Sequence, residues 1–191
     1  MRILDLNEYI NEKLNIKPVS KDRLDSFKEP EVDDETRQYI EDYNFVWNPS
    51  TRCYDCDEDI RVLEDIVSDG KLKIRFGKVN GDFYCYNNEL TTLEGTPRKV
   101  GGDFQCMNNK LTTLESAPQE VGGDFSCSGN HLTTLEGAPQ KVGGDFYCSK
   151  NNLTTLEGAP QEVGGDFYCS NNPNLVLPKE KPSWIKGNII Q

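Results

Sequence analysis

A block of 21 residues recurs along the second half of this 191-residue chain and constrains its fold more than any other feature. One unit, written from its strand, is GGDFxCxxNxLTTLEGAPxxV. The aspartates that mark the register are Asp82, Asp103, Asp124, Asp145 and Asp166. A fixed period of this length is typical of a solenoid, in which each unit buries its apolar side by stacking on its neighbours. Such an array offers a long repetitive surface rather than one deep pocket.

Composition and charge fit a repeat protein and disfavour several other classes. Only 35% of the residues are hydrophobic, which a solenoid tolerates because each repeat needs few inward side chains. No apolar run is as long as a membrane-spanning helix, and the N-terminus lacks an apolar signal segment, so we expect a cytoplasmic protein with no membrane partner. The net charge is −11, and residues 1–67 hold 18 acids against nine bases. This balance opposes nucleic-acid binding and permits a basic protein partner.

Strand alternation sorts each repeat into inward and outward columns of side chains. The inward columns stack phenylalanine, cysteine, leucine and valine, and each buried side chain of this size contributes roughly 1.5–3 kcal/mol of transfer free energy. The phenylalanine column comprises Phe83, Phe104, Phe125, Phe146 and Phe167, and the cysteine column comprises Cys85, Cys106, Cys127, Cys148 and Cys169. An asparagine column follows, at Asn88, Asn109, Asn130, Asn151 and Asn172. Its amides can bond backbone groups where the strand turns away.

The pattern F-x-C-x-x-N-x-L-x-x-L in each unit resembles the leucine-rich repeat pattern L-x-L-x-x-N-x-L-x-x-L. In one unit it is made by Phe104, Cys106, Asn109, Leu111 and Leu114. The strings GGDFxC and LTTLEGAP resemble leucine-rich repeat proteins of tailed phages and bacteria. The resemblance covers about residues 79–177. Glycine replaces the first leucine of the family pattern, and the glycine and proline in EGAPQ exclude a regular helix from the return segment.

We therefore predict an α+β fold, a leucine-rich-repeat solenoid with a parallel β-sheet of about six rungs and non-helical convex segments, preceded by a small helical N-terminal cap. Residues 1–70 form the acidic helical segment and cap, and residues 71–191 form the solenoid, with a C-terminal cap at 173–191. Near the end, residues 185–190 echo residues 163–168 and predict a partial last rung. Trp184 is expected to cover the end of the core.

The sequence of the N-terminal segment predicts several short helices. They begin at Asn7, at Ser20, and at Asp33 or Asp34. Another is predicted over 55–70, because Asp55 and Glu58 resemble a capping box ahead of an apolar run. The stretch 71–76, KLKIRF, alternates like a strand.

The outward strand positions differ between repeats while the core columns barely change. These positions hold Tyr84, Tyr86, Gln105, Met107, Ser126, Tyr147 and Tyr168, and the in-register Asp103, Asp124 and Asp145 lie on the same face. Tyrosine and serine are typical of binding surfaces, and the alternative is an ordinary solvated strand face. In-register aspartates about 4.8 Å apart repel by roughly 1 kcal/mol in water. Solvation and hydrogen bonding to backbone N–H groups are favoured over calcium, which needs about 6–8 oxygens.

Other columns and motifs carry structural interpretations. Lys99, Glu120, Lys141 and Glu162 alternate in sign and favour one stacking register. The repeat cysteines are interpreted as buried small hydrophobes rather than disulfides. Cys53 and Cys56 form a single CxxC pair, and a structural zinc site needs four ligands, so we expect no metal and no cofactor.

These observations favour a non-catalytic protein–protein interaction protein that binds a protein partner through the exposed strand face. The resemblance implies a phage protein acting on a host or virion component, in the host cytoplasm or the virion. The alternative is a structural spacer or assembly protein whose acidic N-terminal segment makes the contacts. An enzyme is disfavoured because residues 1–70 lack histidine and a matched acid–base pair.

Overall fold

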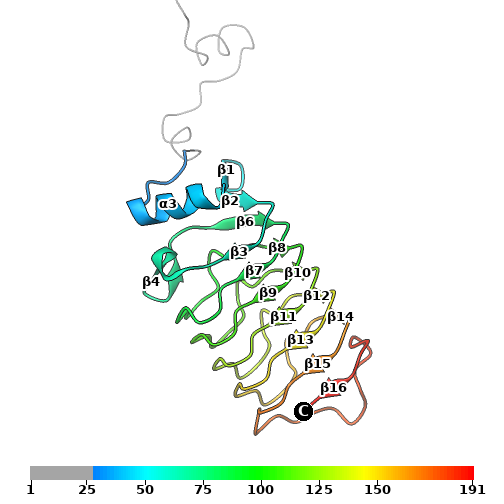
Figure 1. Ribbon diagram of the computed structural model, residues 1–191. Coiled ribbons are helices and arrows are strands. Elements are labelled where there is room, and N and C mark those ends of the chain that lie inside the picture. The colour runs from blue at the N-terminus through cyan, green and yellow to red at the C-terminus, as the bar shows by residue number, and fades with distance from the viewer. Residues whose placement is uncertain (1–27) are drawn as a thin grey trace, which may run out of the picture. The chain divides into compact units, whose positions relative to one another are not determined.

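A computed structural model describes residues 28–191, so the helices predicted to begin at Asn7 and Ser20 lie outside the described residues. The described chain forms a β-solenoid in which successive coils pass through two sheets (Figure 1). Sheet A has seven strands, in the spatial order β1 (Val46–Asn48), β2 (Cys53–Cys56), β6 (Phe76–Val79), β8 (Lys99–Val100), β10 (Glu120–Val121), β12 (Lys141–Val142) and β14 (Glu162–Val163). Sheet B has seven, in the order β3 (Ile60–Arg61), β7 (Phe83–Tyr84), β9 (Phe104–Gln105), β11 (Phe125–Ser126), β13 (Phe146–Tyr147), β15 (Phe167–Tyr168) and β16 (Ile189–Ile190).

Neighbouring repeats pair in parallel and in register. Phe125 pairs with Phe104 on one side and Phe146 on the other, and Val121 likewise pairs with Val100 and Val142. Only β1 runs antiparallel to its neighbour within sheet A. The predicted solenoid of stacked parallel strands is therefore confirmed.

The helix predicted over 55–70 is wrong, because this segment forms an additional rung. Ile60 pairs with Phe83 in sheet B, and the Oδ1 atom of Asp59 accepts a hydrogen bond from the backbone N–H of Asp82 at 2.8 Å. Ile60 is fully buried and Val62 is 4% exposed, in the places that phenylalanine and cysteine hold in later rungs. Extending the core by one rung thus outweighs the local capping signal.

After this rung the chain leaves the repeat path. It forms the 3₁₀ helix η1 (Glu64–Ile66) and then the antiparallel pair β4 (Val67–Ser68) and β5 (Lys71–Leu72). The strand predicted over 71–76 is accordingly divided, since Lys71 and Leu72 belong to this hairpin and sheet A resumes at Phe76.

One α-helix, α3 (Asp34–Asp42), precedes the first rung in the described chain. Asp33 caps it as predicted, because its side chain accepts a hydrogen bond from the Thr36 N–H at 2.8 Å. Hydrogen bonding from Thr36 and from the Lys73 side chain lowers the pKa of Asp33. The buried Tyr39 donates from its hydroxyl to the carbonyl oxygen of Arg61 at 2.8 Å, so the helix covers the edge strand β3.

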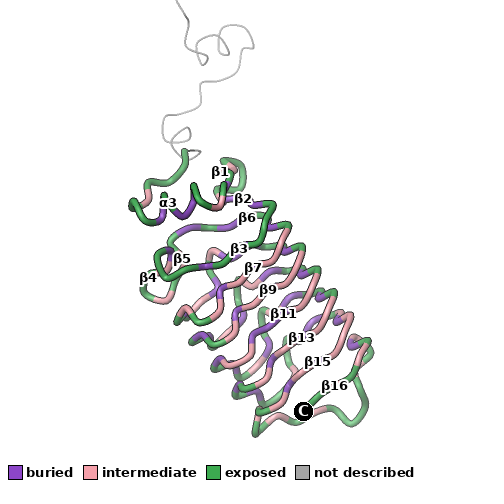
Figure 2. Tube along the Cα trace, in the orientation of Figure 1, coloured by how far each residue is buried: buried purple, intermediate pink, exposed green. Residues whose placement is uncertain are grey.

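Stacked phenylalanine rings run through the core, and buried residues recur in every coil (Figure 2). Ring centroids from Phe83 to Phe167 lie 5.1–5.5 Å apart, with interplanar angles of 5–22°. At the C-terminal end Ile189 pairs with Phe167, and the Trp184 ring packs edge-on against Phe167 at 5.4 Å. The predicted last rung and its tryptophan cover are confirmed.

Glycine pairs precede four of the repeat aspartates and are required there by the close approach of neighbouring rungs, at Asp103, Asp124, Asp145 and Asp166. A Cβ atom on Gly122 would lie 2.0 Å from the carbonyl oxygen of Gly101. One on Gly123 would lie 2.1 Å from Oδ1 of Asp103. Both distances are far below van der Waals contact, so the GG pair sets how tightly the rungs stack.

The asparagine column forms hydrogen bonds with backbone groups where each strand of sheet B ends. Nδ2 of Asn130 donates to the carbonyl oxygens of Cys106 and Cys127 at 3.1 and 3.0 Å, and Oδ1 accepts from the Leu111 N–H at 3.1 Å. Asn109 and Asn151 make the equivalent bonds, as the sequence predicts.

Candidate functional site

The outward face of sheet B carries the candidate residues in three parallel columns. Alternation places the aspartates first, then the column of Tyr84, Gln105, Ser126, Tyr147 and Tyr168, and then the column that contains Tyr86 and Met107. All of these candidate residues are half-buried except Ser126, which is 4% exposed. The expectation that Ser126 is exposed is wrong, because its short side chain stands in register between those of Gln105 and Tyr147.

The aspartates form a continuous hydrogen-bonded ladder along the solenoid. In each rung Oδ1 accepts the backbone N–H of the residue at the same position in the next rung, at 2.7–2.8 Å. The ladder runs from Asp59, through the five repeat aspartates, to the N–H of Asn188. The sequence-based interpretation that backbone N–H groups hold these carboxylates together is confirmed.

Tyrosine hydroxyls occupy the second carboxylate oxygen at two rungs. Tyr147 donates to Oδ2 of Asp145 at 2.9 Å, and Tyr84 donates to Oδ2 of Asp82. The hydrogen bond to Asp82 is the main reason that the pKa of Tyr84 is raised, whereas burial comes first for Tyr147. Both hydroxyls therefore stay protonated, and both rings are held against the face.

The two central rungs differ, because Gln105 and Ser126 replace the tyrosine. Among the described residues, no side chain donates a hydrogen bond to Oδ2 of Asp103 or Asp124. Partial burial raises the pKa of Asp124, and the neighbouring charges of Asp103 and Asp145 add to the shift. The central rungs of sheet B thus hold two adjacent carboxylates whose Oδ2 atoms accept no hydrogen bond from a described side chain.

Aromatic pairs lie on either side of these central rungs. The rings of Tyr147 and Tyr168 stack at 4.5 Å with an interplanar angle of 12°, and those of Tyr84 and Tyr86 meet at 6.1 Å. Sequence reasoning missed Arg61, whose guanidinium carbon lies 5.6 Å from the centroid of the Tyr86 ring. The 23-residue separation of Asp59 from Asp82 breaks the 21-residue period and conceals this rung.

A polar cavity of about 540 Å³ lies beside the face, where the first repeat meets residues 64–70. Asn88 lines it, and its Nδ2 donates to the carbonyl oxygens of Val62 and Tyr86. Unlike its counterparts, Asn88 accepts no hydrogen bond from the described residues, because the preceding segment has left the repeat path. Glu89 and Lys110 also line the cavity and are ion-paired at 3.1 Å.

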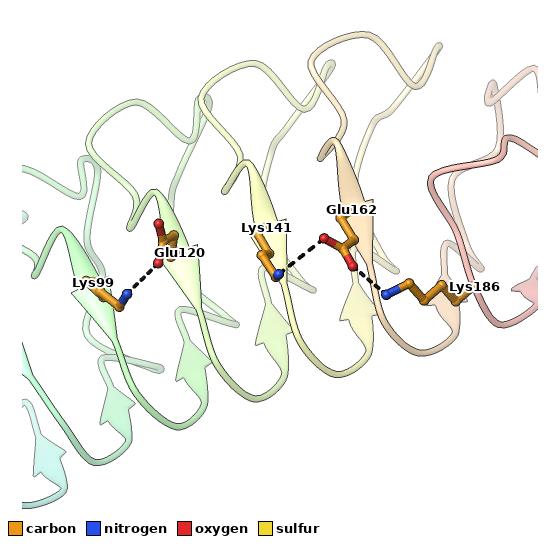
Figure 3. Close-up of polar contacts among 5 residues, drawn as sticks. All are labelled: Lys99, Glu120, Lys141, Glu162 and Lys186. Atoms are coloured by element: carbon orange, nitrogen blue, oxygen red, sulfur yellow. Dashed lines mark hydrogen bonds and ion pairs between the residues drawn. The ribbon is translucent and has the colours of Figure 1, made fainter.

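The charged column of sheet A lies away from this face. Lys99 pairs with Glu120, while Glu162 lies between Lys141, at 3.3 Å, and Lys186 (Figure 3). These contacts hold neighbouring rungs in the predicted register, and all five side chains are at least partly exposed. They stabilise the stack modestly.

The cysteines have structural surroundings. Cys53 is half-buried, and the other six are buried free thiols. Burial is the first cause of the raised pKa of Cys56 and of every repeat cysteine. Within residues 28–191 no three metal-ligating side chains are placed to hold an ion, and no helix could span a membrane.

No protein-family model matches the chain, and searches of curated proteins and of solved structures find no match.

Proposed function

We propose that the chain is a non-catalytic protein-interaction protein that binds a partner protein through the outward face of sheet B. The observation that carries this proposal is a set of tyrosines held in fixed positions on the one face whose residues, apart from the aspartates, vary between repeats. Tyr84 and Tyr147 are fixed by hydrogen bonds to Asp82 and Asp145, and the Tyr168 ring stacks on Tyr147. Rigid, half-buried aromatic rings lose little conformational entropy on binding, so they suit a contact surface.

The chemistry of the face favours binding over catalysis. The Oδ1 atoms of the aspartates are committed to the backbone ladder, and two tyrosine hydroxyls are committed to Oδ2 atoms. The two tyrosine hydroxyls keep their protons because their pKa values are raised, whereas a general acid or base must exchange its proton during the reaction.

The proposal extends to family and origin through the resemblance in the repeats. A leucine-rich repeat protein of phage origin would present this face to a host factor or a virion component, in the host cytoplasm or in the virion. Both the GGDFxC strand and the LTTLEGAP return segment support this assignment.

The test is affinity capture from the cells in which the protein is made, read by mass spectrometry. Tyr147→Ala together with Tyr168→Ala should lose the partner. The matched control, Lys99→Ala with Lys141→Ala on sheet A, should retain it. If the tyrosine variant captures the partner as well as the wild type does, the outward face of sheet B is not the binding surface.

The second candidate function is a spacer or assembly part that makes its contacts through the acidic N-terminal segment. The excess of acidic residues in positions 1–67 favours it. Deleting residues 1–30 separates the two candidates. Loss of the partner from the deletion alone would favour the spacer, and retention would favour the strand face.

A further inference from the structure

We propose that the partner presents an arginine to the central rungs of sheet B, where its guanidinium bonds the outer oxygens of Asp103 and Asp124 beside the ring of Tyr147. This inference rests on the proposed function and specifies the chemistry of the partner. The occupant is a basic protein segment whose arginine reaches the face between the two aromatic pairs.

The charge of the face is strongly one-sided. Its outward strand positions hold six aspartates, from Asp59 to Asp166, and a single base, Arg61. The mixed Lys–Glu column lies on sheet A and leaves this charge uncompensated. The negative charge of sheet B therefore attracts a basic protein segment, whose positive charge complements that of the face.

Among the four consecutive rungs from Asp82 to Asp145, the hydrogen bonds leave one neighbouring pair of carboxylates for an incoming group. Asp82 and Asp145 already accept tyrosine hydroxyls at Oδ2, whereas Asp103 and Asp124 use only Oδ1, for the ladder. Adjacent rungs are about 4.8 Å apart, so one planar guanidinium can donate to both outer oxygens. Neutralising Asp124 also removes the mutual repulsion that contributes to its raised pKa.

Arg61 shows that a tyrosine on this face can hold a guanidinium. Its guanidinium carbon lies 5.6 Å from the centroid of the Tyr86 ring. Arg61 pairs with Tyr84, so Tyr86 belongs to the next rung. Ser126 pairs in register with Tyr147, so a guanidinium at Asp124 would meet the Tyr147 ring in a comparable way. Arginine suits the site better than lysine because its planar group stacks on a ring while it donates to carboxylates.

The test uses fluorescein-labelled nona-arginine and nona-lysine, with binding to the full chain followed by fluorescence anisotropy at fixed low salt. The variant Asp103→Asn with Asp124→Asn removes two charges but keeps both Oδ1 acceptors, so the ladder survives. The matched control, Glu115→Gln with Glu136→Gln, removes two exposed carboxylates from the return segment. Circular dichroism melting establishes that both variants are folded.

We expect nona-arginine to bind the aspartate variant about tenfold more weakly than the wild type, and the glutamate variant nearly as tightly as the wild type. Nona-lysine should bind the wild type several-fold more weakly than nona-arginine does. Equal weakening in both variants would reduce the effect to net charge and overturn the inference. Unchanged binding in the aspartate variant, or equal affinity for the two peptides, would also overturn it.

Partner capture distinguishes failure of this inference from failure of the proposed function. A partner lost by the Tyr147→Ala and Tyr168→Ala variant but retained by the aspartate variant would leave the strand face standing and exclude the arginine. A partner retained by both variants would remove the strand face as well.

Discussion

The Oδ1 atom of Asp103 accepts a hydrogen bond from the backbone N–H of Asp124 at 2.8 Å, so a side chain of one rung is bonded to the backbone of the next. The preceding glycines bring the two rungs close enough for this bond. The same residue therefore contributes an acceptor to the fold and a negative charge to the surface. These two roles can be separated by substitution.

Asp124→Ala and Asp124→Asn should have opposite consequences. Alanine removes the acceptor for the N–H of Asp145, and an unpaired backbone donor costs about 1–3 kcal/mol. Asparagine keeps the acceptor and removes repulsion from Asp103 and Asp145, so stability should be unchanged or higher by up to about 1 kcal/mol. Urea unfolding of the two variants measures the difference, and equal destabilisation by both would contradict the ladder.

Gly143→Ala should destabilise the stack severely. The added Cβ would lie 2.1 Å from the carbonyl oxygen of Gly122, and two backbone segments would have to separate. We expect a loss of about 3 kcal/mol or more, measured by thermal melting. Gln105→Ala, on the outward face, is the control and should stay close to the wild type. A Gly143→Ala protein as stable as the wild type would show that the rungs can spread at no cost.

The exact repetition of the sequence made the inner columns predictable. Once Phe104 and Phe125 occupy the same place in a 21-residue period, parallel stacking leaves their rings face to face, and the structure has them at 5.5 Å. The last rung was predictable for the same reason, since a one-residue insertion still leaves Ile189 opposite Phe167.

The first rung could not be recognised in this way. Asp59 stands 23 residues before Asp82, and isoleucine and valine replace phenylalanine and cysteine. A capping signal at Asp55 and Glu58 then favoured a helix locally. Burial of Ile60 and Val62 against residues distant in the sequence overrides that preference. A short stretch of sequence does not reveal which distant residues will cover these side chains.

The candidate face was predictable in outline and not in detail. Alternation assigned Tyr84 and Tyr147 to the outward side, but their hydrogen bonds to Asp82 and Asp145 depend on side-chain conformations that a period does not specify. The burial of Ser126 likewise depends on the size of its neighbours across the strands.

Glu162→Gln should make stability less sensitive to acid. Hydrogen bonds and charge from Lys186 and Lys141 lower the pKa of Glu162 in the folded chain. A lowered pKa means that this carboxylate contributes stability above its unfolded value of 4.5 and loses it as the pH falls below that value. The difference between wild type and variant should therefore shrink between about pH 5 and pH 3.

Urea midpoints measured across this pH range, at low and at high salt, check the Glu162 prediction. The stability difference between wild type and variant should be smaller in high salt, because Lys141 and Lys186 are exposed and salt screens their charges. Glu157→Gln removes one exposed charge outside the column and serves as the control. A pH-independent difference would show that the two lysines do not act through charge.

Trp184→Ala should loosen the C-terminal end before the rest of the solenoid. The ring packs against Phe167 at 5.4 Å and is only half-buried, so we expect a loss of about 2–3 kcal/mol, less than for a fully buried tryptophan. Hydrogen exchange should speed up first in residues 163–190. Val176→Ala, at a side chain that is 75% exposed, should leave exchange unchanged. Uniform acceleration throughout the solenoid would instead indicate that it unfolds as one unit.

Thiol labelling should separate Cys53 from the six other cysteines. Alkylation requires an accessible thiolate, and burial raises the pKa of Cys106 and Cys127 while excluding the reagent. We expect one of the seven thiols to react quickly with iodoacetamide in the folded chain, and peptide mapping should place it at Cys53. The other six thiols should react only when neighbouring rungs separate and expose them.

The order of the slow reactions reports where the stack opens. Cys169 lies in the last complete repeat, and its 2% exposure contrasts with the complete burial of Cys106 and Cys127. If rungs detach from the ends of a solenoid, Cys169 should be labelled well before those central thiols. Labelling of Cys127 at the same rate as Cys169 would mean that the repeats open together, and Cys53→Ser would confirm that the fast reaction belongs to Cys53.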